Sequence, residues 1–240
     1  MVIPLANEEK TLAELFTAIT AALQFLPQCL VIMVVDNASK DNTYERCKEQ
    51  ASNDSRFKVY FHHNSRSVVD AYLADFKQAL LAGADCIIEM DGGMSHNPEQ
   101  LPSFYKQWQL GYNAVFGSRF SKGGSLVNAT KQRRFLSKRG TQVSNLLLAT
   151  TLSDMTSGFE AFDAKLLAQI VNYPLKSRAH FFQTELRYLC RKTTHIEIPI
   201  IHCSPAKQVA PASILNAISC LLSYTLLRFT FNAPALKDED

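Results

Sequence analysis

Hydrophobic and polar positions follow two alternating patterns along the first half of the chain. Continuous apolar runs at residues 30–35 and 86–90 are typical of strands that are covered on both faces. Between such runs, apolar residues recur at helical spacing, as in residues 11–25 and 68–81. Strand and helix signals that alternate in this way predict an α/β domain with a mostly parallel sheet.

These patterns define the expected elements. Strands are predicted at residues 2–4, 30–35, 58–61, 86–90, 114–116 and 195–199. Helices are predicted at residues 11–25, from 41 or 42 through 49, at 68–81, from 97 to about 109, and around 180–191. Asn97 followed by Pro98 fits a helix start, because the first helical position does not need its N–H group.

Polar segments follow three of the predicted strands, at residues 4–8, 36–43 and 91–97. In an open α/β sheet, ligands bind beyond the carboxyl ends of the strands. We therefore expect these three segments to share one edge of the sheet and to face one cleft. The sequence contains neither GxGxxG nor GxxxxGK[ST], so neither a dinucleotide fingerprint nor a P-loop supports the usual ligands.

Composition narrows the class of protein. The chain of 240 residues is 47% apolar and 20% charged, as in ordinary globular proteins. A net charge of +3 gives no argument for nucleic acid as a partner. The six cysteines are widely scattered and are expected to be free thiols in a reducing compartment. No basic segment precedes an apolar one at the N-terminus, so we expect no signal peptide and a cytoplasmic protein.

Eight short segments stand in a fixed order along nearly the whole chain. They are VIPLANEE (2–9), VVDNASKDNT (34–43), IIEMDGGMSHNPE (87–99), GSRFSKGG (117–124), RRFLSKRG (133–140), DMTSGFEAFD (154–163), FFQTEL (181–186) and IEIPI (196–200). Together they resemble the family-2 glycosyltransferases of GT-A fold and, among these, the dolichol-phosphate mannose synthase group.

The resemblance implies one GT-A domain at residues 1–213, with a Rossmann-like, mostly parallel sheet flanked by helices. A C-terminal amphipathic helix and charged tail would follow at residues 214–240. The implied activity is transfer of a sugar, with inversion, from GDP-mannose or a UDP-sugar to a polyprenyl or dolichyl phosphate. The implied cofactor is Mg²⁺ or Mn²⁺, and the enzyme would be cytoplasmic or peripheral on the cytoplasmic face of a membrane.

Binding roles follow from the resemblance position by position. Pro4, Asn7 and Glu8 would line the nucleoside pocket, with Glu8 on the ribose. Asp36 would contact the base. Lys207 is the one cation in the segment 201–213, which in the family usually closes over the phosphates.

Catalytic roles follow in the same way. Asp91 would reach the metal and the diphosphate, and Asp154 would lie near the reacting sugar. Arg119, with Arg133 and Ser137, would hold phosphate oxygens of the donor or the acceptor. The chemistry needs such groups, because a cation and arginines stabilise the charge that grows on the leaving diphosphate. The acceptor phosphate is already a nucleophile, so a strong general base is less necessary.

The sequence departs from the family pattern at the expected metal site. Gly93 stands where the family usually has the second carboxylate of an Asp-x-Asp motif. Magnesium uses one or two carboxylates with phosphates and water, so Asp91 alone would bind it more weakly. Ser95, Asn97 or His96 would give outer-shell help, and the two glycines would make room for the diphosphate.

Other departures lie in two loops. Ser67 and Val69 replace glycines of the family, and residues 201–213 lack the expected arginine and Gly-Ser-Lys. Three histidines, His62, His63 and His202, are interpreted as structural, and His96 is disfavoured as a metal ligand.

Structural alternatives stand beside the functional roles. Asp91 would then only cap a turn, and Glu8 would only compensate a helix dipole. The basic residues at 131–139 would form a solvated helix face. Arg134 and Lys138 lie four residues apart, however, and like charges at that spacing favour an anionic partner, either a phosphate or a membrane surface.

The segment 214–231 is at the lower limit of length for a membrane span. Its polar residues Asn216, Ser219, Ser223 and Thr230 fall on one stripe, which predicts an amphipathic helix. Such a helix docks on the domain, lies in the membrane interface, or packs against a partner, and we favour the last two. A membrane subunit or a second copy of the chain are the candidate partners.

Two other functions stay open from the sequence. A transferase to a glycan hydroxyl would need a general base, for which Asp154 is the candidate. A non-catalytic relative would bind nucleotide sugar without transferring it, and Gly93, Val69 and the altered segment 201–213 favour that alternative.

Overall fold

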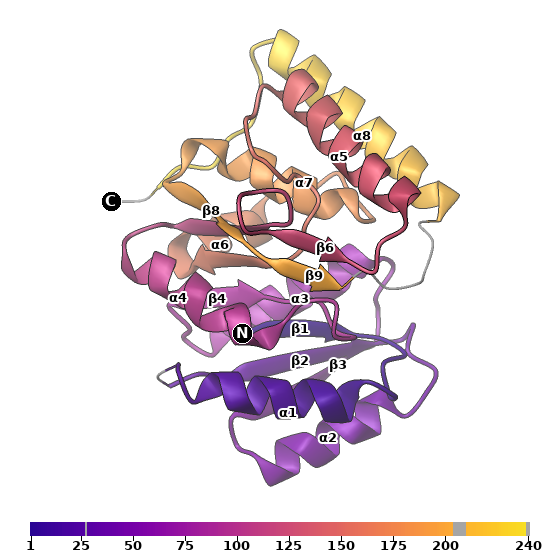
Figure 1. The fold of residues 1–240 in the computed structure, drawn as a ribbon, viewed down its shortest axis with the longest axis vertical. Helices are drawn as coiled ribbons and strands as arrows, with labels where there is room; N and C mark the ends of the chain where they lie inside the picture. Colours follow the sequence, from indigo (N-terminus) through magenta and orange to yellow (C-terminus); the bar gives the residue numbers. More distant parts are fainter. Residues whose placement is uncertain (27, 204–209, 239–240) are drawn as a thin grey trace.

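A computed structural model describes residues 1–26, 28–203 and 210–238 of the chain (Figure 1). Its main sheet has seven strands in the order β3-β2-β1-β4-β7-β5-β8. A second sheet pairs two short strands, β6 and β9. The strands are β1 (Val2–Leu5), β2 (Val31–Asp36), β3 (Phe57–His62), β4 (Cys86–Glu89), β5 (Ala114–Ser118), β6 (Ser125–Val127), β7 (Glu160–Asp163), β8 (His195–Pro199) and β9 (Ile201–Cys203).

Helices connect these strands. They are α1 (Leu12–Leu23), α2 (Thr43–Asn53), α3 (Val68–Leu81), α4 (Leu101–Gln109), α5 (Lys131–Leu148), α6 (Ala164–Asn172), α7 (Phe181–Leu189) and α8 (Pro211–Phe229). Short 3₁₀ turns, η1 (Pro98–Gln100) and η2 (Cys190–Lys192), precede α4 and follow α7. All six predicted strands and the predicted helices are present, so the α/β fold class is confirmed.

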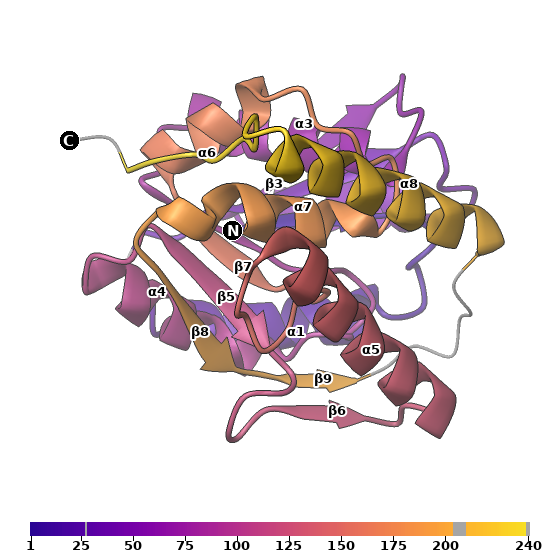
Figure 2. The same ribbon diagram turned by 90° about the horizontal axis from the view of Figure 1, so that it is seen from above.

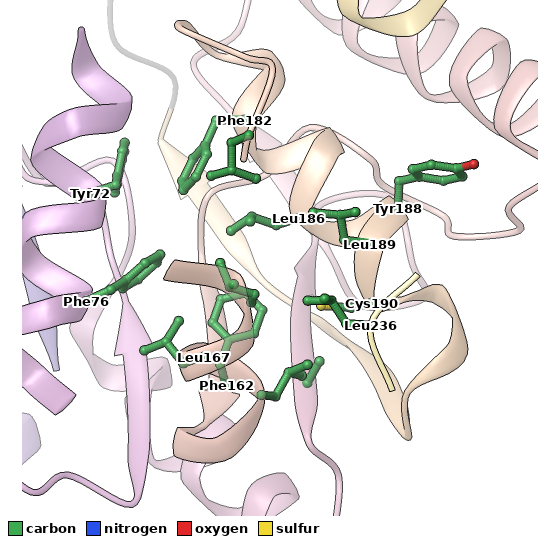
Figure 3. Packing of buried hydrophobic residues seen from close by; sticks show 14 of the residues in the cluster. Tyr72, Phe76, Phe162, Leu167, Phe182, Leu186, Tyr188, Leu189, Cys190 and Leu236 are labelled. Atoms are coloured by element: carbon green, nitrogen blue, oxygen red, sulfur yellow. The ribbon is translucent and has the colours of Figure 1, made fainter. Parts of the chain in front are cut away.

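Helices cover both faces of the main sheet. On one face, Ile3 and Met33 pack in a core with residues of α1, α2 and α4. On the other face, Val2 and Val34 pack with residues of α3, α6 and α7. Neighbouring residues along a strand thus enter opposite cores, as the pleat requires. Figure 3 shows aromatic rings of the second core, in which Tyr72 stacks on Phe182 with their centroids 5.2 Å apart.

Strand β7 was not predicted, and it lies in the middle of the sheet. It runs antiparallel to both β4 and β5, whereas β5 and β8 are parallel to each other. The segment DMTSGFEAFD that contains β7 was interpreted only as a motif, because its four strand residues are too few to give a clear alternation. The sheet is therefore mostly parallel with one antiparallel strand.

Strand directions bring the functional loops to one edge. β2, β1 and β4 are parallel neighbours, so the segments after them meet at their carboxyl ends, as predicted. Because β4 and β5 both run opposite to β7, the segments after β5 and β8 reach the same edge. The segment before β7 arrives there as well. We call the segments after β1 and β2 the β1–β2 side of this edge, and the others the β4–β8 side.

Helices α5 and α8 lie side by side at one end of the molecule (Figures 1 and 2). Arg228 on α8 donates a hydrogen bond to the Leu147 carbonyl at the end of α5, at 2.9 Å. α8 has the length and composition of a membrane-crossing helix, and most of its surface is exposed. The division of the chain at residue 213 stays a prediction, and the helix itself begins at Pro211.

Candidate active site

Asn7 joins the two loops of the β1–β2 side. Its side-chain amide donates to the Ala38 carbonyl at 3.0 Å, and its side-chain oxygen accepts from the Lys40 N–H at 2.9 Å. Its φ of 59° lies in the left-handed region, which asparagine tolerates better than most residues. Asn7 therefore holds the shape of the edge where the sequence places the nucleoside pocket.

The other residues predicted for the pocket lie at the same place. Pro4 is in β1 opposite Val34, next to the end of β2. Asp36 is buried at the end of β2 and accepts a hydrogen bond from the Ala38 N–H at 3.0 Å. The Glu8 N–H donates to the Thr43 hydroxyl at 2.8 Å. The structure brings these predicted residues together, while their contacts with a nucleoside stay a prediction.

The two glycines after Asp91 are explained by protein contacts. A Cβ atom on Gly92 would lie 2.5 Å from a methyl group of Leu5, and one on Gly93 would lie 2.7 Å from Oε2 of Glu8. Gly93 also has a φ of +72°, which L side chains rarely adopt. Side chains of Leu5 and Glu8, rather than open space for a diphosphate, adjoin these glycines. A side chain at position 93 would require the Glu8 carboxylate to move.

Asp91 itself is held in a defined orientation. Its Oδ1 accepts a hydrogen bond from the Tyr72 hydroxyl at 2.6 Å. Its Oδ2 lies 3.9 Å from Nε2 of His96, and one third of the side chain is exposed. The carboxylate is thus fixed through Oδ1, and the functional role of Asp91 stays a prediction.

His96 and His202 lie beside Asp91. One donor atom from each of the three residues lies within 4.8 Å of the others. Both histidines are buried, and burial lowers the pKa of each to about 3, so their rings are neutral at physiological pH. Imidazole nitrogens with a carboxylate suit Mn²⁺ and other transition ions, so the residues present fit a divalent cofactor.

From the sequence, His202 is interpreted as structural and His96 is disfavoured as a metal ligand. The structure places both histidines beside Asp91, and a role in metal binding stays a prediction. They meet through an isolated antiparallel bridge, with ring centroids 5.0 Å apart. Position was the signal that could have found His202, since it follows the carboxyl end of β8 just as Asp91 follows that of β4.

Arg119 and Asp154 form a buried ion pair. The guanidinium donates through Nε at 2.7 Å and through Nη2 at 2.8 Å to the two carboxylate oxygens. Burial alone would raise the pKa of Asp154, but the hydrogen bonds and charge of Arg119 hold it well below its usual range. Asp154 is therefore a weak base. The structure thus brings two predicted catalytic residues together. Their charged groups bind each other.

A second buried arginine, Arg187, supports this pair. Its Nε donates to Glu160 at 2.7 Å, and its Nη2 donates to the carbonyls of Gly117 and Ser157 at 3.1 and 3.0 Å. Another bond goes to the Asp154 carbonyl. Arg187 thus joins the ends of β5 and β7 to α7. No sequence pattern singles out Arg187, because a lone arginine in a helix usually faces solvent.

The basic residues predicted on α5 line its surface. Arg134 donates to the Leu126 carbonyl at 2.8 Å, and the Lys138 ammonium lies 5.6 Å from the centre of the Phe120 ring. Both cations therefore have protein partners, which weakens the argument that they need an anion. Burial and then the charge of Arg119 lower the pKa of Arg133.

Arg133 lies in the first turn of α5, and Ser137 is one turn further along the same helix. Lys207 lies outside the described residues. The roles predicted for all three in holding phosphate oxygens stay predictions.

Comparison with known proteins agrees with this geometry. The profile of the family described as "Glycosyl transferase family 2" matches residues 1–171. A polyprenol monophosphomannose synthase of Mycolicibacterium smegmatis is 31% identical over 203 residues, which cover 83% of this chain and 75% of the relative. An undecaprenyl-phosphate mannosyltransferase of Micrococcus luteus is 31% identical over 171 residues, 70% of each chain. A dolichol-phosphate mannosyltransferase of Pyrococcus furiosus is 31% identical over 73% of this chain and 49% of the relative.

Solved structures show the same fold. Glucosyl-3-phosphoglycerate synthase from Mycobacterium tuberculosis, in complex with Mn²⁺, UDP and glucosyl-3-phosphoglycerate, superposes with a TM-score of 0.59 at 16% identity, over 95% of this chain and 77% of that one. A mannosyltransferase from Pyrobaculum calidifontis with GDP-Man and Mn²⁺ gives 0.54 at 14% identity, over 98% and 64%. With its GT-A architecture and its match to the family profile over most of the sequence, the chain belongs to the family-2 glycosyltransferases.

Proposed function

We propose that the protein transfers a sugar from a nucleotide-diphosphate sugar to a polyprenyl phosphate, with inversion at the sugar carbon. The observation that carries the proposal is the place of Asp91. Its carboxylate is fixed by Tyr72 at the edge of the sheet, next to loops that Asn7 holds together. A donor that spans these loops would have its nucleoside on the β1–β2 side and its diphosphate at Asp91.

The relatives support a polyprenyl phosphate as the acceptor and mannose as the sugar. All three curated relatives carry names of enzymes that transfer mannose to a polyprenol-type phosphate. We therefore favour GDP-mannose over a UDP-sugar as the donor. The solved structures of similar fold include complexes with either nucleotide class, so the fold alone favours neither.

The buried ion pair supports a phosphate acceptor over a glycan hydroxyl. A hydroxyl acceptor needs a general base with a pKa near the working pH. The pKa of Asp154 is held far below that range by Arg119, and both of its oxygens are engaged. A phosphate acceptor attacks through an oxygen that already carries negative charge, so it needs no proton transfer from this carboxylate.

Asp91, Arg133 and Arg119 have different roles in the proposed transfer. A bound Mg²⁺ or Mn²⁺ ion would offset the charge that develops on the leaving diphosphate. Asp91 would bind that ion, and Arg133 on α5 would hold phosphate oxygens. Arg119 would act mainly by fixing the segment of Asp154 and Thr156, because Asp154 already takes two of its hydrogen bonds.

The surface of α5 and α8 supports a location at a membrane. Apolar side chains of both helices are exposed. They are Phe135, Leu136, Val143 and Leu146 on α5, and Ile214, Leu215, Ile218, Leu222, Leu226 and Phe229 on α8. Basic residues of α5 lie beside them, a combination that favours the interface of an anionic bilayer. We propose that the protein binds peripherally to the cytoplasmic face through this surface, where a lipid acceptor is available.

Calorimetric titration with GDP and UDP, each with and without Mg²⁺, tests the donor site. We expect GDP to bind more tightly and the metal to strengthen binding. A transfer assay with GDP-mannose then compares a polyprenyl phosphate with free sugars as acceptors. Binding of neither nucleotide by folded protein would contradict the proposal, and nucleotide binding without any transfer would identify a non-catalytic relative.

A further inference from the structure

Three potential metal ligands converge on the β4–β8 side from two segments of the chain. Asp91 follows β4, His96 lies just before η1, and His202 lies in β9 after β8. One donor atom of each lies within 4.8 Å of the other two. The sheet topology creates this cluster, because β4 and β8 deliver their following segments to the same edge.

The two histidines carry ring nitrogens without partners. Nε2 of His96 and Nδ1 of His202 are buried and make no hydrogen bond with the residues that the structure describes. A buried polar atom left unsatisfied is unfavourable. Two such atoms beside a carboxylate oxygen offer a bound cation the lone pairs that it needs.

The chain has no second carboxylate at this place, because residue 93 is a glycine. Position 93 has a backbone conformation that favours glycine, and Glu8 fills the space that its side chain would take. Glu8 itself is held by the Thr11 hydroxyl at 3.1 Å. A metal ion near Asp91 must therefore take its further protein ligands from elsewhere, and the histidines are beside it.

We propose that Asp91, His96 and His202 form a divalent metal site with one oxygen and two nitrogen donors, which prefers Mn²⁺, Co²⁺ or Zn²⁺ over Mg²⁺. The inference rests on the proposed function, because it names the ion class of that site. The preference follows from ligand chemistry. Imidazole suits transition ions, whereas Mg²⁺ dehydrates reluctantly and prefers oxygen ligands.

The geometry is close to what such an ion needs. Zinc bonds to nitrogen and oxygen are about 2.0–2.2 Å long, so two ligand atoms of one tetrahedral ion are about 3.4 Å apart. Nε2 of His96 and Oδ2 of Asp91 are 3.9 Å apart, slightly wider than this. The three donor atoms lie within 4.8 Å of one another and must draw together by up to about an ångström to bind one ion.

Binding has one local consequence. Nδ1 of His96 accepts a long hydrogen bond, 3.2 Å, from the Asp91 N–H, so the ring proton of the neutral side chain is on Nε2. An ion at Nε2 displaces that proton to Nδ1, and the hydrogen bond is lost. The Asp91 N–H and the new Nδ1–H then face each other as two buried donors, and the affinity of the three-ligand site has to outweigh that cost.

The open side of the cluster suits a substrate. The histidines are buried, while the Asp91 side chain is partly exposed and therefore marks the direction of solvent. Three protein ligands leave further coordination positions on that side. Phosphate oxygens of the donor are the groups that would fill them in the proposed reaction.

The test is titration of the full chain, free of nucleotide, with Mg²⁺, Mn²⁺, Co²⁺ and Zn²⁺ in turn. Calorimetry gives the affinities, and the visible spectrum of bound Co²⁺ reports nitrogen ligation. We expect Co²⁺ and Zn²⁺ to bind at least about tenfold more tightly than Mg²⁺, with Mn²⁺ between them. Equal affinities for Co²⁺ and Mg²⁺ would overturn the inference.

Variants assign the ligands. His202→Gln should lower Co²⁺ affinity at least about tenfold and change the Co²⁺ spectrum, with little effect on Mg²⁺. His96→Gln should do the same if it folds, and His202→Gln keeps the test valid if it does not. His63→Gln, an exposed histidine outside the cluster, is the matched control and should change neither. An unchanged affinity and spectrum in His202→Gln would overturn the assignment.

The two proposals fail separately. If nucleotide binding and transfer proceed with Mg²⁺, and the histidine variants bind every metal as the parent chain does, the histidine ligands are wrong and the function stands. If the parent chain binds Co²⁺ through nitrogen ligands but binds neither GDP nor UDP, the metal site stands and the function is wrong.

Discussion

The two sides of the functional edge are built in different ways. On the β1–β2 side, partly exposed loops are joined by hydrogen bonds of Asn7, Glu8 and their neighbours, over sequence separations of 31–35 residues. On the β4–β8 side, buried charged and polar groups from distant segments meet. Gln183, for example, donates to Glu89 at 2.7 Å across 94 residues.

The difference predicts how substitutions act. Exposed hydrogen bonds contribute little to global stability, so changes on the β1–β2 side should act mainly on ligand affinity. Buried ions without their partners are strongly unfavourable, so changes on the β4–β8 side should affect the free energy of unfolding as well as activity.

The largest effect is expected from Arg119→Met. It leaves the Asp154 carboxylate buried without its cation, and breaking such a pair costs about 3–5 kcal/mol. Urea unfolding at pH 7 measures the loss. Arg134→Met, which removes a cation from the exposed surface of α5, is the control and should change stability much less. A loss below about 1 kcal/mol for Arg119→Met would show that the two sides do not differ as described.

The second-largest effect is expected from Asp91→Ala. It removes the carboxylate that the proposed site needs for the ion and the diphosphate, so the transfer rate should fall by about 10²–10³-fold or more. The fold should persist, because the side chain is partly exposed. Single-turnover transfer and a circular dichroism spectrum are the two measurements. Retained turnover would remove Asp91 from the site.

Gly93→Asp should not restore a two-carboxylate site. The left-handed backbone alone costs about 1–2 kcal/mol, and the new side chain meets Glu8. Gly83→Asp is the matched control, because Gly83 has a φ of +73° and no atom near its Cβ position. Thermal unfolding should show a greater loss at position 93 than at 83. Equal losses of thermal stability at the two positions would mean that the Glu8 side chain moves aside at little cost.

Asn7→Ala probes the β1–β2 side. It removes two hydrogen bonds that hold the loop after β2, so nucleotide affinity should fall by about tenfold, while stability changes by about 1 kcal/mol. Calorimetry with GDP and with Co²⁺ separates the effects, since metal affinity should stay unchanged. A parallel loss of metal affinity would show that the two sides act as one unit.

The smallest effect is expected from Asp75→Asn. Burial raises the pKa of Asp75 well above its usual value, so the folded state keeps a proton that the unfolded state releases above about pH 4. Because of Asp75, the free energy of unfolding therefore decreases as pH rises from about 4 towards the pKa of the folded state. The variant cannot titrate, so its stability should fall less than that of the parent chain between pH 5 and 8. Parallel stability curves would contradict the raised pKa.

Much of the fold and one side of the site could be predicted from the sequence. Apolar runs and helical spacing located β1 to β5, β8 and most helices, because each depends on burial of residues close in the chain. The loops at Asn7, Asp36 and Asp91 followed from the rule that parallel strands place their carboxyl ends together.

The sequence by itself determined the α/β class, the shared edge and the place of Asp91 on that edge. Only the tertiary structure decided that Arg119 meets Asp154, that Glu8 fills the space beside Gly93, and that His202 lies next to His96. These contacts depend on which strands become neighbours, through the unpredicted insertion of β7 between β4 and β5. Periodicity records only whether a residue is buried, and burial of a charge or an imidazole does not name its distant partner.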